Sequence, residues 1–305
     1  MTTTASTTIT IPATTANLGP GFDCIGAALS LYNRLKFSIA DSATELKIVV
    51  TGKEASRVST DKSNLAYQAF IKLYESINQT PPPVRIEIDL GVPLARGLGS
   101  SATAIVGGLV GANQLAGNPL SQTEVMNLAI AIEGHPDNVV PALLGGCRLT
   151  ASTHNGWALC DIPWHSDIVP VVAIPDFELS TAEARQVLPK EYSRADAIFN
   201  SAHLGMLLRG LETGNGDWLK AGMQDKIHQP YRKSLIKGYE EVRLAALNAG
   251  AYEMVISGAG PTLLALTNLL TTSTVVTAMA DAWKNQEVVT EVKALEIDTI
   301  GAVCS

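Results

Sequence analysis

Hydrophobic positions in the first third of the chain follow two different periods. Residues 44–50 and 84–90 alternate apolar and polar side chains, which predicts half-buried strands. Between them, residues 62–78 carry apolar side chains at four-residue spacing, which predicts an amphipathic helix with Ser63 near its start. Residues 9–13 predict a first strand. The chain therefore begins as a mixture of strands and helices.

The rest of the chain continues this mixture. Four further strands are expected, at 168–174, 253–257, 262–267 and 287–297. Six further helices are expected, at 102–116, 121–133, 195–211, 217–226, 231–249 and 274–284. Two capping boxes, Ser121 with Glu124 and Ser180 with Glu183, mark helix starts.

The order of these elements predicts an α+β fold with two lobes and a cleft between them. Composition is uniform, without a low-complexity linker or a repeat. We place the boundary within 150–165, which divides the chain into domains 1–155 and 156–305.

Composition narrows the class of partner. The chain has 305 residues, 46% hydrophobic and 17% charged, with a formal net charge of −7. Because Lys and Arg form no cluster, neither nucleic acid nor an anionic membrane is expected as the main partner. A small anionic ligand is still compatible with this net charge, since backbone dipoles and a bound cation at the site can outweigh it locally.

Four scattered cysteines, with no Cys-x-x-Cys pair, favour buried free thiols over a zinc site or disulfides. The start of the chain has neither a basic n-region nor an apolar h-region, and no run approaches eighteen apolar residues. We therefore expect a cytoplasmic protein.

The segment 93–102, Pro-Leu-Ala-Arg-Gly-Leu-Gly-Ser-Ser-Ala, lies between a predicted strand and a buried helix. A glycine-rich turn at a helix start presents free N–H groups and the positive end of the helix dipole, which suits phosphate. The alternative is a tight turn that needs glycine for positive φ. The paired serines favour the phosphate site, because one can cap the helix while the other faces a phosphate or its metal.

Two familiar phosphate loops do not fit this segment. A triphosphate P-loop ends in Gly-Lys-Ser/Thr, whereas Gly99 is followed by two serines. The spacing Gly97-x-Gly99-x-x-Ala102 matches a dinucleotide fingerprint formally. However, a spacer separates the strand from the glycines, and the next element is a helix rather than a strand ending in an acidic residue.

Polar side chains crowd a second segment, Glu133-Gly-His135-Pro-Asp137-Asn138. A helix-stop turn with solvated carboxylates accounts for the proline and the asparagine. The alternative is a magnesium site that pairs Glu133 with a serine of the glycine loop, since Mg²⁺ prefers oxygen ligands.

Two more glycine turns occupy 17–23 and 257–261. Each is explained singly by turn chemistry, or by a close approach of backbone to a ligand. Arg185 and Arg232 are either exposed or paired within the protein, or else grip a ligand carboxylate.

Together these motifs resemble the kinase superfamily named for galactokinase, homoserine kinase, mevalonate kinase and phosphomevalonate kinase. Residues 93–102 match its signature, Pro-x-x-x-Gly-Leu-Gly-Ser-Ser-Ala, in full. The turns at 11–23, 134–142, 180–185 and 257–261 are similar to those of its homoserine kinases. The resemblance implies an N-terminal ATP-binding lobe with a left-handed β-α-β unit, a ferredoxin-like C-terminal α/β sandwich, and an active site between them. It also implies ATP-dependent phosphorylation of the side-chain hydroxyl of L-homoserine, giving O-phospho-L-homoserine on the route to threonine.

The resemblance assigns residues to ATP and Mg²⁺. Asn64 would touch the adenine, and Ser101 and Glu133 would hold Mg²⁺, although many relatives place the metal carboxylate further upstream. The loop around the ATP phosphates would comprise Pro93, Leu94, Ala95, Arg96, Gly97, Leu98, Gly99, Ser100, Ser101, Ala102 and Thr103.

It also assigns the homoserine pocket: Asn17, Asp23, His135, Asn138, Thr181, Arg185, Arg232, Gly258 and Gly260. Asn17, Asp23 and Asn138 would be the catalytic residues. Asp23 suits the substrate ammonium better than the role of general base, and the two arginines suit the carboxylate. A sister kinase acting on mevalonate or shikimate, or a silent nucleotide-binding protein, are the alternatives. We also expect a homodimer.

Overall fold

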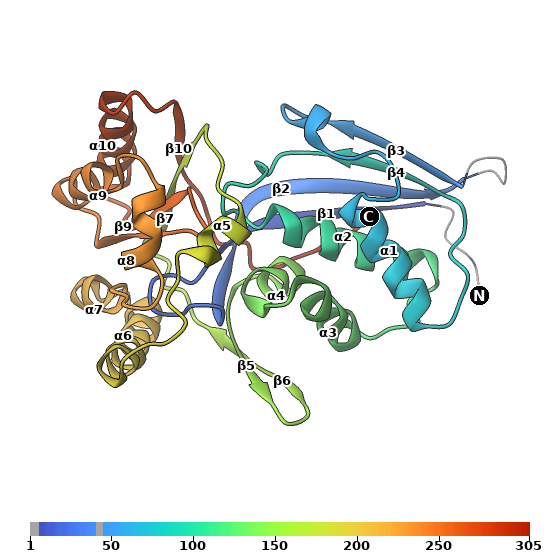
Figure 1. Cartoon of the computed structure of the whole chain (residues 1–305), viewed down its shortest axis with the longest axis horizontal. Helices are drawn as coiled ribbons and strands as arrows, with labels where there is room; N and C mark the ends of the chain where they lie inside the picture. Colours follow the sequence, from blue (N-terminus) through green and yellow to red (C-terminus); the bar gives the residue numbers. More distant parts are fainter. Residues whose placement is uncertain (1–5, 41–44) are drawn as a thin grey trace.

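The computed structural model describes residues 6–40 and 45–305, and it places them in two lobes side by side (Figure 1). The first residues of the chain and the predicted strand start at residue 44 lie outside the described residues. Within the described residues, one sheet has seven strands and the other has four. The α+β class and the two-lobed arrangement are confirmed.

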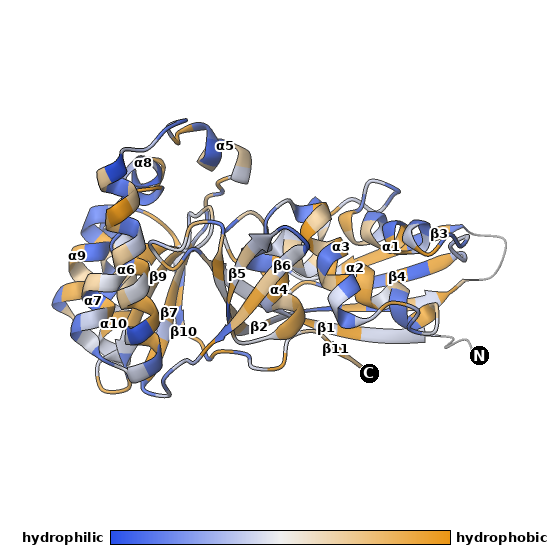
Figure 2. Ribbon diagram, turned by 90° about the horizontal axis from the view of Figure 1, so that it is seen from below, coloured by the Kyte–Doolittle hydropathy of each residue, from blue (hydrophilic) through white to orange (hydrophobic). Residues whose placement is uncertain are grey.

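The N-terminal lobe is built on the larger sheet, with strand order β11-β1-β2-β4-β3, and β5 and β6 attached to β2. Among the strands that the structure describes in this sheet, only β3 and β4 pair in parallel, and α1 connects them as a β-α-β unit. Figure 2 shows α1, α2 and α3 along one face of this sheet. The strands are β1 (Ser6–Ala16), β2 (Ile25–Ile39), β3 (Leu46–Thr51), β4 (Val84–Asp89), β5 (Cys147–Thr153), β6 (Gly156–Ile162) and β11 (Val303–Cys304). The helices are α1 (Leu65–Ser76), α2 (Ser100–Leu115), α3 (Gln122–Glu133) and α4 (Pro136–Leu144).

The C-terminal lobe has an antiparallel sheet with strand order β10-β7-β9-β8. If β7, β8, β9 and β10 are numbered 1 to 4 in chain order, their order across the sheet is 4-1-3-2. This is the strand order of a ferredoxin-like sandwich. The strands are β7 (Ile168–Pro175), β8 (Glu253–Ile256), β9 (Leu263–Asn268) and β10 (Thr290–Ala294). The helices are α5 (Thr181–Gln186), α6 (Arg194–Thr213), α7 (Gly216–Gly222), α8 (Gln229–Arg232), α9 (Tyr239–Asn248) and α10 (Thr272–Asn285).

Each lobe has its own apolar core. Ile9, Phe37, Phe70 and Leu109 lie in one buried cluster between the larger sheet and its helices. In the second lobe, α9 and α10 cover one face of the sheet, where Trp283 is fully buried. Helices α6 and α7 bury their apolar side chains in a separate cluster that also includes residues of both sheets. Within the described residues, every helix falls short of the length or apolar character that spanning a bilayer requires.

Several predicted elements differ from the structure. The single helix expected at 231–249 is split into α8, a 3-10 turn (Lys233–Leu235) and α9, because Gly238 adopts a φ of 75° at the start of α9. The strand β2 was not predicted because it is buried on both faces at its start and alternates only later, so it follows no single period. All four cysteines are free thiols, as expected, but only Cys147 is buried: Cys24 and Cys304 are half-buried, and Cys160 is exposed on β6, so the prediction of burial was wrong for Cys160.

The two lobes meet where the turn between β8 and β9 lies against the glycine-rich loop. The Ser257 hydroxyl donates a hydrogen bond to the carbonyl of Gly97 at 2.7 Å, and the N–H of Thr262 donates to the carbonyl of Arg96 at 3.2 Å. The N–H of Gly258 reaches the end of β1, at the carbonyl of Ala16, at 3.1 Å. These bonds fix the glycine loop between the lobes.

Gly97→Ala tests how tight this contact is. A Cβ at Gly97 would lie 2.3 Å from the carbonyl oxygen of Ser257, and the backbone there has a φ of +76°. We expect the free energy of unfolding to fall by about 3 kcal/mol, from positive φ and overpacking together. The control is Gly117→Ala, with a φ of +86° but no atom within 4 Å, which should cost about 1 kcal/mol. If denaturant titrations show equal losses of unfolding free energy for the two variants, the turn after β8 is not closely packed against the loop at Gly97.

Candidate active site

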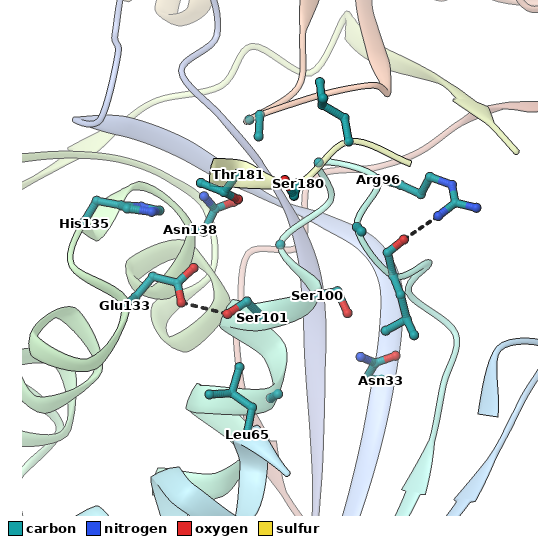
Figure 3. Close-up of a pocket in the computed structure, with 18 of the residues that line it drawn as sticks. Asn33, Leu65, Arg96, Ser100, Ser101, Glu133, His135, Asn138, Ser180 and Thr181 are labelled. Carbon is teal, nitrogen blue, oxygen red and sulfur yellow. Dashed lines mark hydrogen bonds between the residues drawn. The ribbon is translucent and has the colours of Figure 1, made fainter. Parts of the chain in front are cut away.

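A cleft of about 440 Å³ lies between the lobes and collects most of the residues singled out in the sequence (Figure 3). The predicted residues that line it are Asn17, Asp23, Asn64, Leu94, Ala95, Arg96, Gly97, Gly99, Ser100, Ser101, Glu133, His135, Asn138, Thr181, Arg185, Arg232 and Gly258. The predicted residues that do not line it are Pro93, Leu98, Ala102, Thr103 and Gly260. Of these, Leu98, Ala102, Thr103 and Gly260 are buried behind its wall.

The glycine loop delivers the start of α2 to the cleft. Gly97 and Gly99 have φ values of 76° and 69°, and Gly99 is the N-cap residue. The prediction that a serine caps this helix is wrong, because Gly99 occupies the cap position and no described side chain caps α2. A Cβ at Gly99 would lie 2.0 Å from the hydroxyl of Thr14, so only glycine fits. The first N–H groups of α2 are therefore left without a side-chain cap, in the geometry that binds phosphate.

Ser101 and Glu133 meet at the open side of the loop. The Ser101 hydroxyl donates to Glu133 Oε2 at 2.8 Å, although the residues are 32 positions apart (Figure 3). Glu133 is the last residue of α3, and Ser101 lies in the first turn of α2. Two oxygen groups from different helices therefore face one point beside the phosphate loop, and they are the ligand type that Mg²⁺ prefers.

His135, Asp137 and Asn138 form a linked group at the start of α4. Gly134 ends α3 with a φ of 90°, and Pro136 opens α4, so the segment joins two helices. His135 Nδ1 lies 2.6 Å from Asp137 Oδ1, and Asn138 Nδ2 donates to the same oxygen at 3.2 Å. Burial alone would lower the pKa of His135. The bond to Asp137 and the surrounding negative charges outweigh burial and raise that pKa above its ordinary value.

A charge pair between the lobes lies beside this group, since ligand atoms of Asp23, His135 and Asp137 lie within 4.8 Å of one another. The two oxygens of Asp23 accept from Arg185 Nη1 at 3.0 Å and Nη2 at 2.8 Å. Asn17 holds this loop in place, because its Oδ1 accepts from the N–H of Asp23 at 3.0 Å and its Nδ2 donates to the carbonyl of Gly258 at 2.9 Å. Arg185 is therefore paired across the cleft rather than along its own helix.

Arg232 is buried behind Arg185. Only 2% of it is exposed, and its guanidinium donates to the carbonyls of Ala184 at 3.1 Å and Gly258 at 3.0 Å. Burial first, and then the nearby charge of Arg185, lower the pKa of Arg232, although an arginine stays protonated. Both guanidinium groups lie over the ring of Phe22, at 5.5 Å for Arg185 and 5.0 Å for Arg232. The site thus concentrates two cations in an acidic protein.

Asn64 lies at the apolar end of the cleft. It is the N-cap of α1, immediately after Ser63, which was expected near the helix start, and its Oδ1 accepts from the N–H groups of Ala66 and Tyr67 at 3.0 and 3.2 Å. Its Nδ2 donates to the carbonyl of Ser59 at 2.7 Å. The side-chain amide is thus engaged by backbone, and its contact with adenine stays a prediction.

Asn33 is a functional candidate that the sequence did not reveal. It is buried, and its Oδ1 accepts from the N–H groups of Gly91 and Val92, each at 2.9 Å. Its Nδ2 donates to the hydroxyl of Thr103 at 2.7 Å. Asn33 therefore ties the entry of the glycine loop to the helix that follows it. Its strand, β2, follows no single period, so no signal in the sequence pointed to it.

Arg96 belongs to the glycine loop, but its side chain turns toward the C-terminal lobe. It donates to the carbonyls of Pro175, Asp176 and Leu94 at 3.0, 2.6 and 2.6 Å. Only its backbone therefore faces the position expected for the ATP phosphates.

Arg96 is also part of a closed ring of alternating charges. It lies 3.7 Å from Glu54 and 3.4 Å from Glu178, and Arg57 lies 2.6 Å from each of these two carboxylates. We call these four residues the ion ring. It joins the glycine loop, the turn after β3 and the segment before α5.

Two such lobes around a glycine-loop phosphate site suit an enzyme that binds a nucleoside triphosphate, and comparison with known proteins gives the family. The pattern of the GHMP kinases N terminal domain matches residues 64–146, and that of the GHMP kinases C terminal domain matches residues 207–286. The chain belongs to the GHMP kinase family.

The similar proteins carry more particular names. A homoserine kinase of Trichodesmium erythraeum is 82% identical over 305 residues, covering 100% of both chains. One of Microchaete diplosiphon is 69% identical and covers 98% of this chain and 97% of its own. The crystal structure of homoserine kinase from Cytophaga hutchinsonii has a TM-score of 0.90 at 28% identity and covers 100% of this chain and 99% of its own. That of L. major mevalonate kinase, in complex with R-mevalonate, has a TM-score of 0.72 at 16% identity, covers 95% and 96%, and shows the fold alone.

Arg96→Met tests the anchoring role of the buried guanidinium. We expect the free energy of unfolding to fall by about 3 kcal/mol, because three hydrogen bonds from a charged donor are lost in a buried position. Arg57→Met removes the other, more exposed cation of the ion ring and should cost about 1 kcal/mol or less. Chemical denaturation measures both. If the Arg96 variant loses no more unfolding free energy than the Arg57 variant, Arg96 does not anchor the loop.

Proposed function

We propose that this chain transfers the γ-phosphoryl group of ATP to the side-chain hydroxyl of L-homoserine and gives O-phospho-L-homoserine. The observation that carries the proposal is the charge pattern beside the phosphate loop. The carboxylate of Asp23 lies on one lobe, and the two cations Arg185 and Arg232 lie on the other. An α-amino acid carries the complementary pair of charges. The homoserine kinases similar to this chain support the same substrate.

The glycine loop and the apolar end of the cleft are proposed to hold ATP. The uncapped N–H groups of α2 suit the phosphates. Val58, Leu65 and Leu90 line the other end beside Asn64 and suit a flat, largely apolar base. The ten loop residues from Pro93 to Ala102, together with Thr103, would contribute to phosphate binding through their backbone N–H groups or by fixing the shape of the loop.

Ser101 and Glu133 are proposed to hold Mg²⁺. Both offer oxygen atoms beside the loop, which fits the preference of the ion. When bound, Mg²⁺ neutralises charge on the phosphates during transfer. Among the described residues, Asp23, His135 and Asp137 also lie close enough to hold a metal ion. That cluster suits Mg²⁺ less well, because it includes a nitrogen and its carboxylates are engaged by Arg185 and His135.

The acceptor is proposed to lie against Asp23 through its ammonium and against Arg185 and Arg232 through its carboxylate. Because Asp23 and Arg185 are already paired, an arriving amino acid exchanges one ion pair for two matched ones. The remaining pocket residues, Asn17, His135, Asn138, Thr181, Gly258 and Gly260, would surround the substrate chain.

Catalysis is then mainly positioning and charge neutralisation. Asp23 is a poor candidate for the base, since both of its oxygens accept from Arg185. A loose phosphoryl-transfer transition state needs an aligned hydroxyl more than a strong base. Asn17 and Asn138, fixed by their own hydrogen bonds, would orient that hydroxyl.

Neither alternative accounts for the cleft as well. Mevalonate and shikimate have no ammonium to pair with Asp23. A silent nucleotide-binding protein has no need of the Ser101–Glu133 pair.

We further propose that the chain divides into domains at 1–155 and 156–305, that it forms a homodimer, and that it is located in the cytoplasm. The dimer is tested by sedimentation of the purified protein.

A coupled assay of ADP release tests the function. The purified chain is mixed with Mg·ATP and L-homoserine, and separately with mevalonate and with shikimate. ADP release with homoserine alone supports the proposal, and phosphorus NMR identifies the product as a phosphate monoester. Release no higher than the background without acceptor would contradict it.

Glu133→Gln tests the metal site. We expect the Mg²⁺ concentration for half-maximal rate to rise about tenfold or more, because a carboxylate ligand becomes a neutral amide. The homoserine KM should stay within about twofold. Glu75→Gln, an exposed change on α1, is the control for charge alone. An unchanged Mg²⁺ dependence would place the metal ligand elsewhere.

A further inference from the structure

We infer that His228 is a positioning residue that holds the ammonium-binding and carboxylate-binding halves of the acceptor site in register. The two halves are the loop that bears Asp23, from the N-terminal lobe, and Arg232, from the C-terminal lobe. His228 contacts both and does not line the cleft. This inference rests on the proposed function, because it assigns a role within the same amino-acid site.

The imidazole of His228 is fully buried and bridges two partners. Nε2 lies 2.9 Å from the carbonyl of Gly19, so this nitrogen carries the hydrogen and donates. Nδ1 is then the acceptor, and it faces Arg232 Nη1 at 3.4 Å. Burial, the dominant cause, lowers the pKa of His228, which keeps the ring neutral. A neutral imidazole of this tautomer serves both partners at once.

The ring face of His228 supports the same arrangement. It stacks on Phe22 with centroids 5.2 Å apart, and the guanidinium groups of Arg185 and Arg232 also lie over the ring of Phe22. Phe22 immediately precedes Asp23 in the loop. His228 therefore touches the acceptor loop at two points, its backbone at Gly19 and its side chain at Phe22.

The acceptor loop requires such support. Asn17, Leu18 and Asp23 have φ values of 73°, 45° and 57°, which residues other than glycine rarely adopt. Backbone in such regions persists where the surroundings over-determine it. Other contacts from the C-terminal lobe hold the two ends of this loop, where Asn17 donates to the carbonyl of Gly258 and Asp23 accepts from Arg185. Near its middle, the carbonyl of Gly19 faces His228, and the amide of Asn200 donates to the carbonyl of Pro20 at 3.3 Å.

His228 is itself firmly held. The buried carboxylate of Asp225 accepts from the N–H groups of Ile227, His228 and Gln229 at 2.9, 2.9 and 2.7 Å. It also accepts from Asn200 Nδ2 at 2.7 Å. Because α8 begins immediately after His228, this clamp fixes both the imidazole and the turn that carries Arg232.

The loss of either link should therefore let Asp23 and Arg232 move relative to each other. Both charges would still be present, but their spacing would no longer match an α-amino acid. Affinity for the acceptor would fall, whereas the nucleotide end of the cleft, which His228 does not touch, would keep its affinity.

Two conservative variants separate the links. His228→Asn places an amide oxygen near the position of Nδ1 and keeps the acceptor for Arg232. His228→Gln reaches the position of Nε2 and keeps the donor for Gly19. We expect the homoserine KM to rise about tenfold in each, the change typical of one lost hydrogen bond, while the ATP KM stays within about twofold. His203→Asn and His203→Gln are matched controls, since His203 also stacks on a phenylalanine and lies close to a carbonyl, but both of these partners belong to Phe199 of its own helix, α6.

The outcomes separate the inference from the function. If the wild type does not phosphorylate homoserine, the proposed function fails. If the wild type is active and the His228 variants raise both KM values equally, or lower only the melting temperature, His228 is structural and the inference fails. Should both variants fail to fold, Phe22→Leu removes the stacking face and keeps both hydrogen bonds of His228. It should raise the homoserine KM alone, and an unchanged value would overturn the inference.

Discussion

The rest of the site depends on the contact between the glycine-rich loop and the turn that joins β8 and β9. The hydroxyl of Ser257 and the carbonyl of Gly97 connect the lobes at the point where a side chain would not fit. The same turn offers the carbonyl of Gly258 to both Asn17 and Arg232. One turn of the C-terminal lobe therefore sets the position of the phosphate loop, the acceptor loop and the buried cation together.

Electrostatics then gives the assembled cleft its selectivity. The chain is acidic overall, yet two guanidinium groups lie over one phenylalanine in the cleft, and the carboxylate of Asp23 pairs with one of them. Burial of Arg232 removes competing water, and its backbone acceptors satisfy it without neutralising it. Such a site favours a small molecule that brings both charges, and the phosphate end beside it supplies the reactive group.

The sequence predicted the parts of the site that lie in short motifs. The glycine loop, the crowded segment around Glu133 and the two capping boxes can all be recognised locally, since each depends on neighbouring residues. Asn33, Phe22 and His228 could not be recognised, because their roles come from contacts between segments far apart in the chain. Arg96 shows the opposite case: its place in the motif suggested phosphate, but tertiary packing turned its side chain toward Pro175 and Asp176. In the fold, β2 and the β5–β6 hairpin were missed because neither has a single hydrophobic period.

The central claim is that the cleft recognises an alcohol by both charges of an amino acid, with Asp23 on one lobe and Arg232 on the other. The most direct test compares kcat/KM for L-homoserine, 4-hydroxybutyrate, which lacks the ammonium, and 3-amino-1-propanol, which lacks the carboxylate. We predict that each analogue loses about a thousandfold or more, because each leaves a buried or paired charge without its partner. If either analogue reacts within about tenfold of homoserine, the cleft does not recognise that charge and the account is contradicted.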